Sequence, residues 1–228
     1  SGSSANYMLA TDHPELDGMT NLTLEAFIYS IGSSSAQGLV SKRVSGDVED
    51  DYNIMIRGDL ASQLEFRVGG QATYLRSPAS VETGQWLHVA GTMQLPGAVS
   101  NNMLLYINGA LIGAKDVPAF SGVGNGAADV VLSTLNPGYA SFKGVIDEAR
   151  ISTVARSSNW IWACWMNQIS NATFNTYGAA ETILSPYVAN AGASNVTQNS
   201  AYLGASLIAT GTSPTEVEKP PAFKAKSS

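Results

Sequence analysis

The sequence predicts an all-β protein folded as an antiparallel β-sandwich, with one short helix and a C-terminal strand extension. Short segments with apolar residues at every second position, the pattern of half-buried strands, recur about every ten to fifteen residues. Turn-forming residues separate these segments, and the 228-residue chain contains 22 glycines and 9 prolines. Only one segment has the apolar spacing of an amphipathic helix. Strands joined by turns in this way are typical of a sandwich.

The expected strands cover residues 7–10, 21–29, 38–42, 52–57, 64–68, 85–93, 103–107, 110–113, 130–133 and 142–152. The clearest hairpin turns at Asn108-Gly109, a pair that tolerates positive φ at both turn positions. Period-2 alternation predicts that one set of apolar side chains fills the space between the sheets. This set is Leu24, Ala26, Ile28, Leu64, Phe66, Val89, Leu105, Ile107 and Ile151.

The expected helix covers residues 157–166 and begins with residues that favour N-caps. Trp160, Ile161, Cys164 and Trp165 share one apolar face, and Trp162 lies off it. We expect that face to pack on the sandwich; an aromatic platform for sugar stacking is the alternative. A single cysteine excludes an internal disulfide, and its apolar neighbours predict a buried, unreactive thiol.

Composition and charge exclude some partners. The net charge is −6, the pI is near 4.8, and no cluster of Lys and Arg exists along the sequence to neutralise phosphates. We therefore expect no nucleic-acid partner. No run of 18 apolar residues predicts membrane insertion, and the chain does not begin with a signal-peptide pattern. Residues 1–4 are typical of a cut from a longer protein.

The segment 142–152 is the most informative. Strand periodicity places Val145, Asp147 and Ala149 on one face with Ile151, and Glu148 on the other with Ile146 and Arg150. An ionised aspartate among apolar neighbours is costly unless a cation or several N–H donors contact it. The pattern therefore predicts a buried carboxylate at Asp147.

Segments 21–28, 84–92, 105–109 and 142–152 occur in the order and spacing of a laminin G-like domain of the concanavalin A-like lectin and glucanase superfamily. The resemblance extends from Asn6 to about Tyr177. It implies a jelly-roll sandwich. The continuation 150–161 is similar to domains of large surface proteins of environmental bacteria, which implies an exported chain at the cell surface or outside the cell.

Residues 191–211 resemble the first two strands of a fibronectin type III-like domain. We expect a sandwich at 1–178, an incomplete strand extension at 179–217 and a tail at 218–228. Because two strands cannot bury a core of their own, the extension should pair with another sheet edge. A neighbouring subunit, and hence self-association through 179–228, is favoured over packing on its own sandwich.

Laminin G-like domains often hold Ca²⁺, which takes six to eight oxygen ligands. The resemblance therefore suggests two candidate sets. One joins Asp147 to Asp12 and Asp17, and the other is the acidic loop with Asp47, Glu49, Asp50 and Asp51. The alternatives are an Asp147 held by backbone N–H groups or an arginine, and a solvated acidic loop.

Related sandwiches include glucanases, whose two carboxylates must converge across one glycosidic bond at about 5–10 Å. Asp147 and Glu148 are expected on opposite faces, and neither His13 nor His88 has a Ser or Cys partner in a motif. We therefore expect no enzyme and no catalytic residue. The expected function is a non-catalytic recognition, adhesion or structural module of a bacterial surface protein, with a glycan or a protein as partner. A strand-exchanging subunit of an extracellular fibre or lattice is the alternative, and a glycoside hydrolase the residual one.

Overall fold

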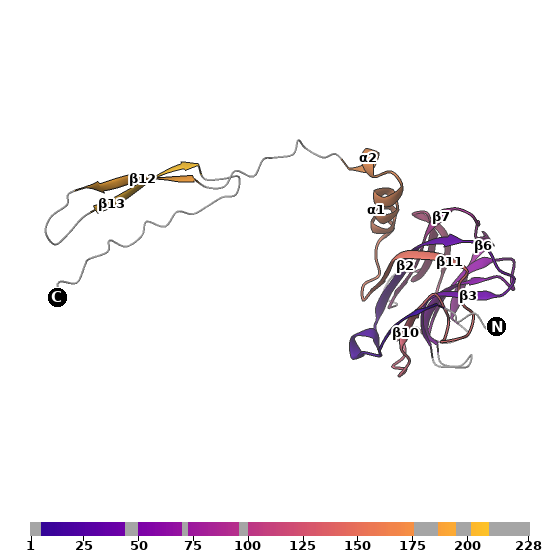
Figure 1. Cartoon of the computed structure of the whole chain (residues 1–228). Coiled ribbons are helices and arrows are strands. Elements are labelled where there is room, and N and C mark those ends of the chain that lie inside the picture. The colour runs from indigo at the N-terminus through magenta and orange to yellow at the C-terminus, as the bar shows by residue number, and fades with distance from the viewer. Residues whose placement is uncertain are drawn as a thin grey trace. The chain divides into compact units, whose positions relative to one another are not determined.

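The computed structural model describes residues 6–43, 50–69, 73–95, 100–175, 187–194 and 202–209. Two antiparallel sheets pack face to face, which confirms the predicted sandwich (Figure 1). One sheet has six strands in the order β1-β10-β3-β4-β5-β6 and the other has five in the order β11-β2-β7-β8-β9. The six are Met8–Ala10, Val130–Leu132, Ala36–Arg43, Asp50–Arg57, Gln63–Val68 and Tyr74–Ser80. The five are Gly144–Ser152, Asn21–Ser30, Trp86–Gln94, Met103–Ile107 and Ala110–Lys115.

The core lies between the sheets and matches the predicted set. Seven of its nine members are fully buried, and Ile107 and Ile151 pack against them partly buried. Gly91 allows the sheets to approach, because a Cβ there would lie 2.4 Å from Cγ of Phe66. The hairpin at Asn108 and Gly109 has the expected positive φ angles of 50° and 73°.

Strand β6 was not predicted, and its sequence explains why. The strand contains Arg76, Ser77 and Pro78, which interrupt the apolar alternation. Proline has no N–H for a sheet ladder and is tolerated on edge strands. β6 is the edge of the six-stranded sheet.

Helix α1, Ser158–Ile169, begins where predicted and is capped by the Ser157 hydroxyl, which accepts a hydrogen bond from the N–H of Trp160 at 3.3 Å. A four-residue helix, α2 (Asn171–Phe174), follows it, and a 3-10 turn, η1 (Pro14–Leu16), follows β1. The predicted apolar face is wrong in part. Ile161 alone is fully buried in the helix, whereas Trp160, which was expected on this face, is 44% exposed. Trp162 is 45% exposed, as expected for a residue off the face.

The helix packs on the outer face of the five-stranded sheet. Ile161 contacts Ala90 of β7 and Tyr106 of β8. A Cβ at Gly109, in the β8–β9 turn, would lie 3.0 Å from Cα of Trp162. The helix therefore covers part of the outer face of this sheet.

The chain divides into two compact units, Ser1–Asn175 and Thr176–Ser228. In the second unit β12 (Tyr187–Ser194) and β13 (Tyr202–Ala209) pair antiparallel as a two-stranded sheet. The resemblance to a fibronectin type III-like domain stays a prediction, and residues 218–228 lie outside the described ranges. Within those ranges, no helix has both the length and the apolar character needed to span a bilayer.

Candidate functional site

A β-bulge in β11 decides where the predicted carboxylates point. Asp147 pairs with Phe27 of β2, and the next pair is Arg150 with Glu25, so β11 holds one extra residue there. Glu148 lies in the bulge with a φ of 50°. The bulge reverses the alternation, so that Ile146, Ala149 and Ile151 all pack against the core.

The prediction of a buried Asp147 is therefore wrong. Asp147 and Glu148 are both exposed, and Oδ1 of Asp147 accepts a hydrogen bond from the N–H of Glu148 at 2.8 Å. The expectation that the two carboxylates face apart is also wrong, because they line the same cavities. Strand periodicity misses this because the sequence gives no sign of the extra residue.

One of these cavities, which we call the groove, lies between α1 and the outer face of the five-stranded sheet. Its volume is about 340 Å³. Trp86 at the start of β7 and Trp165 of α1 supply indole rings, and Gln168 supplies an amide. Phe27, Asp147, Glu148 and Ile169 complete the lining.

Trp86 keeps an accessible ring. Its side chain is 44% exposed, and it meets Tyr29 of β2 edge-on with ring centroids 5.9 Å apart. The neighbouring Phe27 is nearly buried and stacks on His88, with centroids 4.7 Å apart. Aromatic rings on adjacent strands thus form the sheet side of the groove.

An ionic network that is buried at Glu25 and exposed at Glu148 lies on the same face. Glu25, which is 1% exposed, has Oε2 3.4 Å from Nε2 of His88 and Oε1 3.3 Å from Nη1 of Arg150. Arg150 also pairs with the Glu148 carboxylate and lies 3.8 Å from Sγ of Cys164. Burial raises the Glu25 pKa, but the contacts with His88 and Arg150 outweigh it and hold that pKa below its ordinary value.

The sequence pattern indicated no functional role for His88 or Glu25. Both occupy outward positions on adjacent strands, β2 and β7, and both are 1% exposed. The only sequence signal was a charged or titratable residue at an alternating position in an otherwise apolar strand. Cys164 is partly buried, and burial raises the pKa of its thiol.

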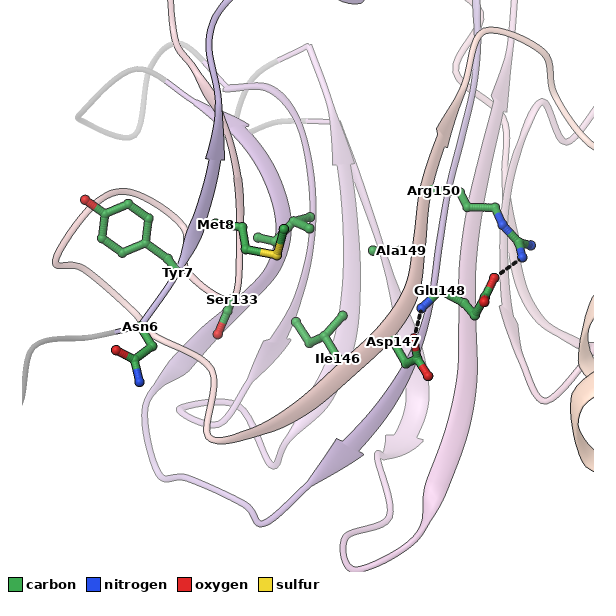
Figure 2. A pocket seen from close by; sticks show the side chains of 10 residues that line it. Asn6, Tyr7, Met8, Ser133, Ile146, Asp147, Glu148, Ala149 and Arg150 are labelled. Carbon is green, nitrogen blue, oxygen red and sulfur yellow. Dashed lines mark hydrogen bonds and ion pairs between the residues drawn. The ribbon is translucent and has the colours of Figure 1, made fainter.

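A second cavity, of about 520 Å³, opens on the other side of β11, between that strand and β1. Figure 2 shows Met8 and Ile146 on this side, whereas Glu148 turns away to meet Arg150. Met8 is 71% exposed. The bulge therefore separates an apolar opening at the sandwich edge from the polar groove, and Asp147 and Glu148 line both.

Asp12 and Asp17 come together, but Asp147 does not join them. Oδ1 of Asp12 and Oδ1 of Asp17 each lie 2.8 Å from Nζ of Lys42, whose side chain is fully buried. Oδ2 of Asp51 lies 3.2 Å from the same nitrogen. Asp51 belongs to the predicted acidic-loop set; Asp47 and Glu49 lie outside the described residues, as does the side chain of Asp50.

The Asp12, Asp17 and Asp51 cluster does not fit a metal ion as it stands. A calcium ion would need oxygens at about 2.3–2.6 Å on all sides, and an ammonium nitrogen already lies among these carboxylates. Among the described residues, no group of three or more His, Cys, Asp and Glu side chains is arranged to hold a metal. Calcium binding therefore stays a prediction.

A further cluster lies on the outer face of the six-stranded sheet. Glu65 is fully buried, and its carboxylate meets Arg57 at 3.2 Å, Arg67 at 2.5 Å, and Arg76. Arg76 stacks over Tyr74 with 4.2 Å between the guanidinium carbon and the ring centroid. The sequence showed no basic cluster because these arginines come from three different strands.

Two packed antiparallel sheets of six and five strands define a concanavalin A-like β-sandwich. The chain belongs to the Laminin_G_3 family of the concanavalin A-like lectin/glucanases superfamily, whose family model matches residues 2–162. A search of curated protein sequences gave no significant match.

Solved structures share the fold at low sequence identity. A candidate carbohydrate-binding protein from Bacteroides ovatus ATCC 8483 has a TM-score of 0.53 and 20% identity over 69% of this chain and 44% of its own. CBM40 of the Ruminococcus gnavus IT-sialidase, bound to α2,3-sialyllactose, has a TM-score of 0.52 and 16% identity over 71% of this chain and 99% of its own. A heptameric SAP-like pentraxin from Limulus polyphemus has a TM-score of 0.52 and 16% identity over 72% of this chain and 84% of its own. The chain thus spans less than half of the Bacteroides protein.

Proposed function

We propose that this chain is a non-catalytic carbohydrate-binding module of an exported, cell-surface or extracellular protein, and that the groove holds the sugar. The observation that carries the proposal is the composition of the groove. Trp86 and Trp165 offer apolar ring faces, and Asp147, Glu148 and Gln168 offer hydrogen-bonding groups in the same cavity. Sugars present both apolar C–H faces and hydroxyl groups, and binding sites combine apolar walls with a few polar groups.

The charges favour neutral or amine-bearing saccharides over carboxylated ones. Glu25, Asp147 and Glu148 contribute three carboxylates to the groove and the network beneath it. Among the described residues of these two features, Arg150 is the only lysine or arginine, and Glu25 and Glu148 both contact it. An anionic sugar would meet a surplus of negative charge, whereas an ammonium group gains from a carboxylate and an indole ring.

The ionic contacts also support a binding role over glycoside hydrolysis. A hydrolase needs a general acid whose pKa is raised so that it carries a proton near neutral pH. Glu25 has a lowered pKa, and Glu148 is paired with Arg150. The groove therefore offers carboxylate and amide groups as hydrogen-bond partners for a sugar.

The test is a glycan array that includes neutral, amine-bearing and sialylated oligosaccharides, followed by calorimetric titration of the strongest hits. We expect binding to neutral or amine-bearing glycans, weak or no binding to sialylated ones, and no release of cleaved sugar. Exclusive binding to sialylated glycans would refute the charge argument while leaving a binding module. No binding to any glycan class would refute the proposed function.

A strand-exchanging subunit of a fibre or lattice is the second candidate. β12 and β13 form a two-stranded sheet, and such a hairpin is marginally stable in water unless something covers it. A strand edge on a second copy would supply that cover. Sizing of the full chain and of a truncated chain tests this candidate.

A further inference from the structure

Four segments of the sandwich converge on the amine of Lys42, near the end of β3. Asp12 follows β1, Asp17 follows the 3-10 turn, and Asp51 belongs to β4. The fourth contact is the carbonyl oxygen of Gly126, in the connection between β9 and β10, which accepts a hydrogen bond from Nζ. Three carboxylates and one carbonyl thus surround one buried nitrogen.

We propose that the Lys42 ammonium occupies the position of a structural divalent cation, and that removing it exposes a metal site for Ca²⁺-like ions. Carboxylate and carbonyl oxygens gathered from several loops are the ligands that calcium takes in proteins. Here the ammonium supplies the positive charge with its three N–H donors. The sandwich therefore needs no metal at this point to join its loops.

The surroundings are shaped to hold the Asp51 carboxylate close. The N–H of Gly126 donates to both carboxylate oxygens, at 3.2 and 3.1 Å. A Cβ would lie 2.3 Å from Oδ1 at Gly124 and 2.6 Å from Oδ2 at Gly126, so side chains at these two positions would displace the loop. The carboxylate geometry is thus fixed by backbone as well as by Lys42.

The charge balance explains why removal of the amine should attract a metal. One ammonium faces three carboxylates, so the cluster keeps a negative excess even with Lys42 present. Without this cation the carboxylates must protonate, repel each other or bind a cation from solution.

Tyr52 adds a further oxygen beside the cluster. Tyr52 is paired with Lys42 across β3 and β4, is fully buried, and its hydroxyl has no hydrogen-bond partner among the described residues. Its ring also provides a reporter, because an excited tyrosine transfers energy to a lanthanide ion held nearby.

The experiment compares the full chain with its Lys42→Met variant. Calorimetry in EDTA and in millimolar Ca²⁺ gives the melting temperatures, and terbium titration followed by tyrosine-sensitised luminescence reports occupancy. Lys115→Met is the control, because Lys115 lies outside the cluster and contacts Tyr74.

We expect the melting temperature of the unmodified chain to be the same in EDTA and in Ca²⁺. Lys42→Met should melt roughly 6–20 °C lower in EDTA, as expected for a buried charge cluster that loses one partner in a domain of this size. Ca²⁺ should restore most of the loss, terbium luminescence should saturate, and Asp17→Asn added to Lys42→Met should abolish both. The Lys115→Met control should respond to neither ion.

Two results would overturn the proposal. One is an unmodified chain that melts lower in EDTA and loses that response through Asp17→Asn, because a metal would then already act at this cluster. The other is a Lys42→Met variant that gains nothing from Ca²⁺. If this variant folds only when Ca²⁺ is present during refolding, the proposal is supported; if it fails to fold with or without the ion, the proposal fails.

Discussion

Glu25 of β2 and His88 of β7 are diagonal neighbours, with 3.4 Å between Oε2 and Nε2, and both are 1% exposed. They turn outward from the core, so α1 and the groove lie over a charged layer rather than an apolar one. Arg150 contacts both Glu25 and Glu148, and so connects this charged layer to the rim of the groove.

The Glu25 contacts predict a specific acid sensitivity. The folded-state pKa of Glu25 lies below the ordinary 4.5, so its stabilising contribution is fully present above about pH 4.5 and is lost as pH falls through the folded-state value. Glu25→Gln should lower the free energy of unfolding at pH 7 by roughly 1–3 kcal/mol. Below the folded-state pKa the difference between variant and parent should shrink. Denaturant titrations at several pH values measure both effects, and a difference that does not change with pH would contradict the assignment.

Trp86 should be the main apolar contact for a sugar in the groove. Trp86→Ala should weaken binding of the best array ligand roughly tenfold, which corresponds to about 1.4 kcal/mol. Trp160→Ala is a matched control, because Trp160 has the same 44% exposure but stacks on Arg156 away from the groove. Titration calorimetry gives both affinities. Equal losses in the two variants would place the sugar elsewhere.

Asp147 should set the charge preference. It is exposed in the groove and its carboxylate accepts a hydrogen bond from the Glu148 N–H. Asp147→Asn keeps the hydrogen-bonding shape and removes one negative charge, so we expect weaker binding of amine-bearing glycans and little change for neutral ones. The ratio of the two affinities, measured at two salt concentrations, is the readout. An unchanged ratio would show that this carboxylate does not contact the charged group.

Gly91 should tolerate no side chain. A Cβ at this position would lie 2.4 Å from Phe66, so Gly91→Ala overpacks the core and should cost roughly 1–3 kcal/mol. That corresponds to a melting temperature lower by about 2–12 °C. Gly113→Ala is the control, because its Cβ would lie at ordinary contact distances, 3.4 Å from the Leu75 side chain and 3.7 Å from the Arg76 carbonyl oxygen. Thermal melts of the two variants are sufficient, and equal values would indicate that the sheets separate easily.

Removal of the second unit tests self-association. The core lies within Ser1–Asn175, so a chain ending at Asn175 should fold with the melting transition of the sandwich. If β12 and β13 pair with another copy, the full chain should sediment as an oligomer and the truncated chain as a monomer. Two monomeric species would remove the fibre or lattice alternative and leave the binding module unaffected.

The sequence predicted those features that depend on regular alternation. Leu24, Ala26 and Ile28 alternate without interruption, and all three are fully buried. The failures occur where one residue breaks the period or where distant segments meet. The bulge at Glu148 reverses the faces of β11, and no residue type near Glu148 indicates that the strand contains an extra residue.

The candidate site was harder to predict for the same reason. The groove combines Trp86 of β7, Asp147 of β11 and Trp165 of α1, which only the strand order β11-β2-β7 brings together. The pairing of Asp12 with Asp17 was anticipated, but their partner Lys42 was not. A lysine in a strand pattern is ordinarily solvent-exposed, and its burial becomes evident only when three carboxylates are placed around it.

The bulge in β11 also affects whether copies of this sandwich can pair edge to edge. β11 is the outer strand of its sheet, and a regular outer strand of nine residues would offer a continuous template for a neighbour's backbone. The extra residue at Glu148 breaks that template midway, and two charged side chains flank the break. The opposite sheet ends in β1, only three residues long. Edge-to-edge pairing of copies through β11 or β1 is therefore disfavoured, and a sheet shared between copies would have to use other strands.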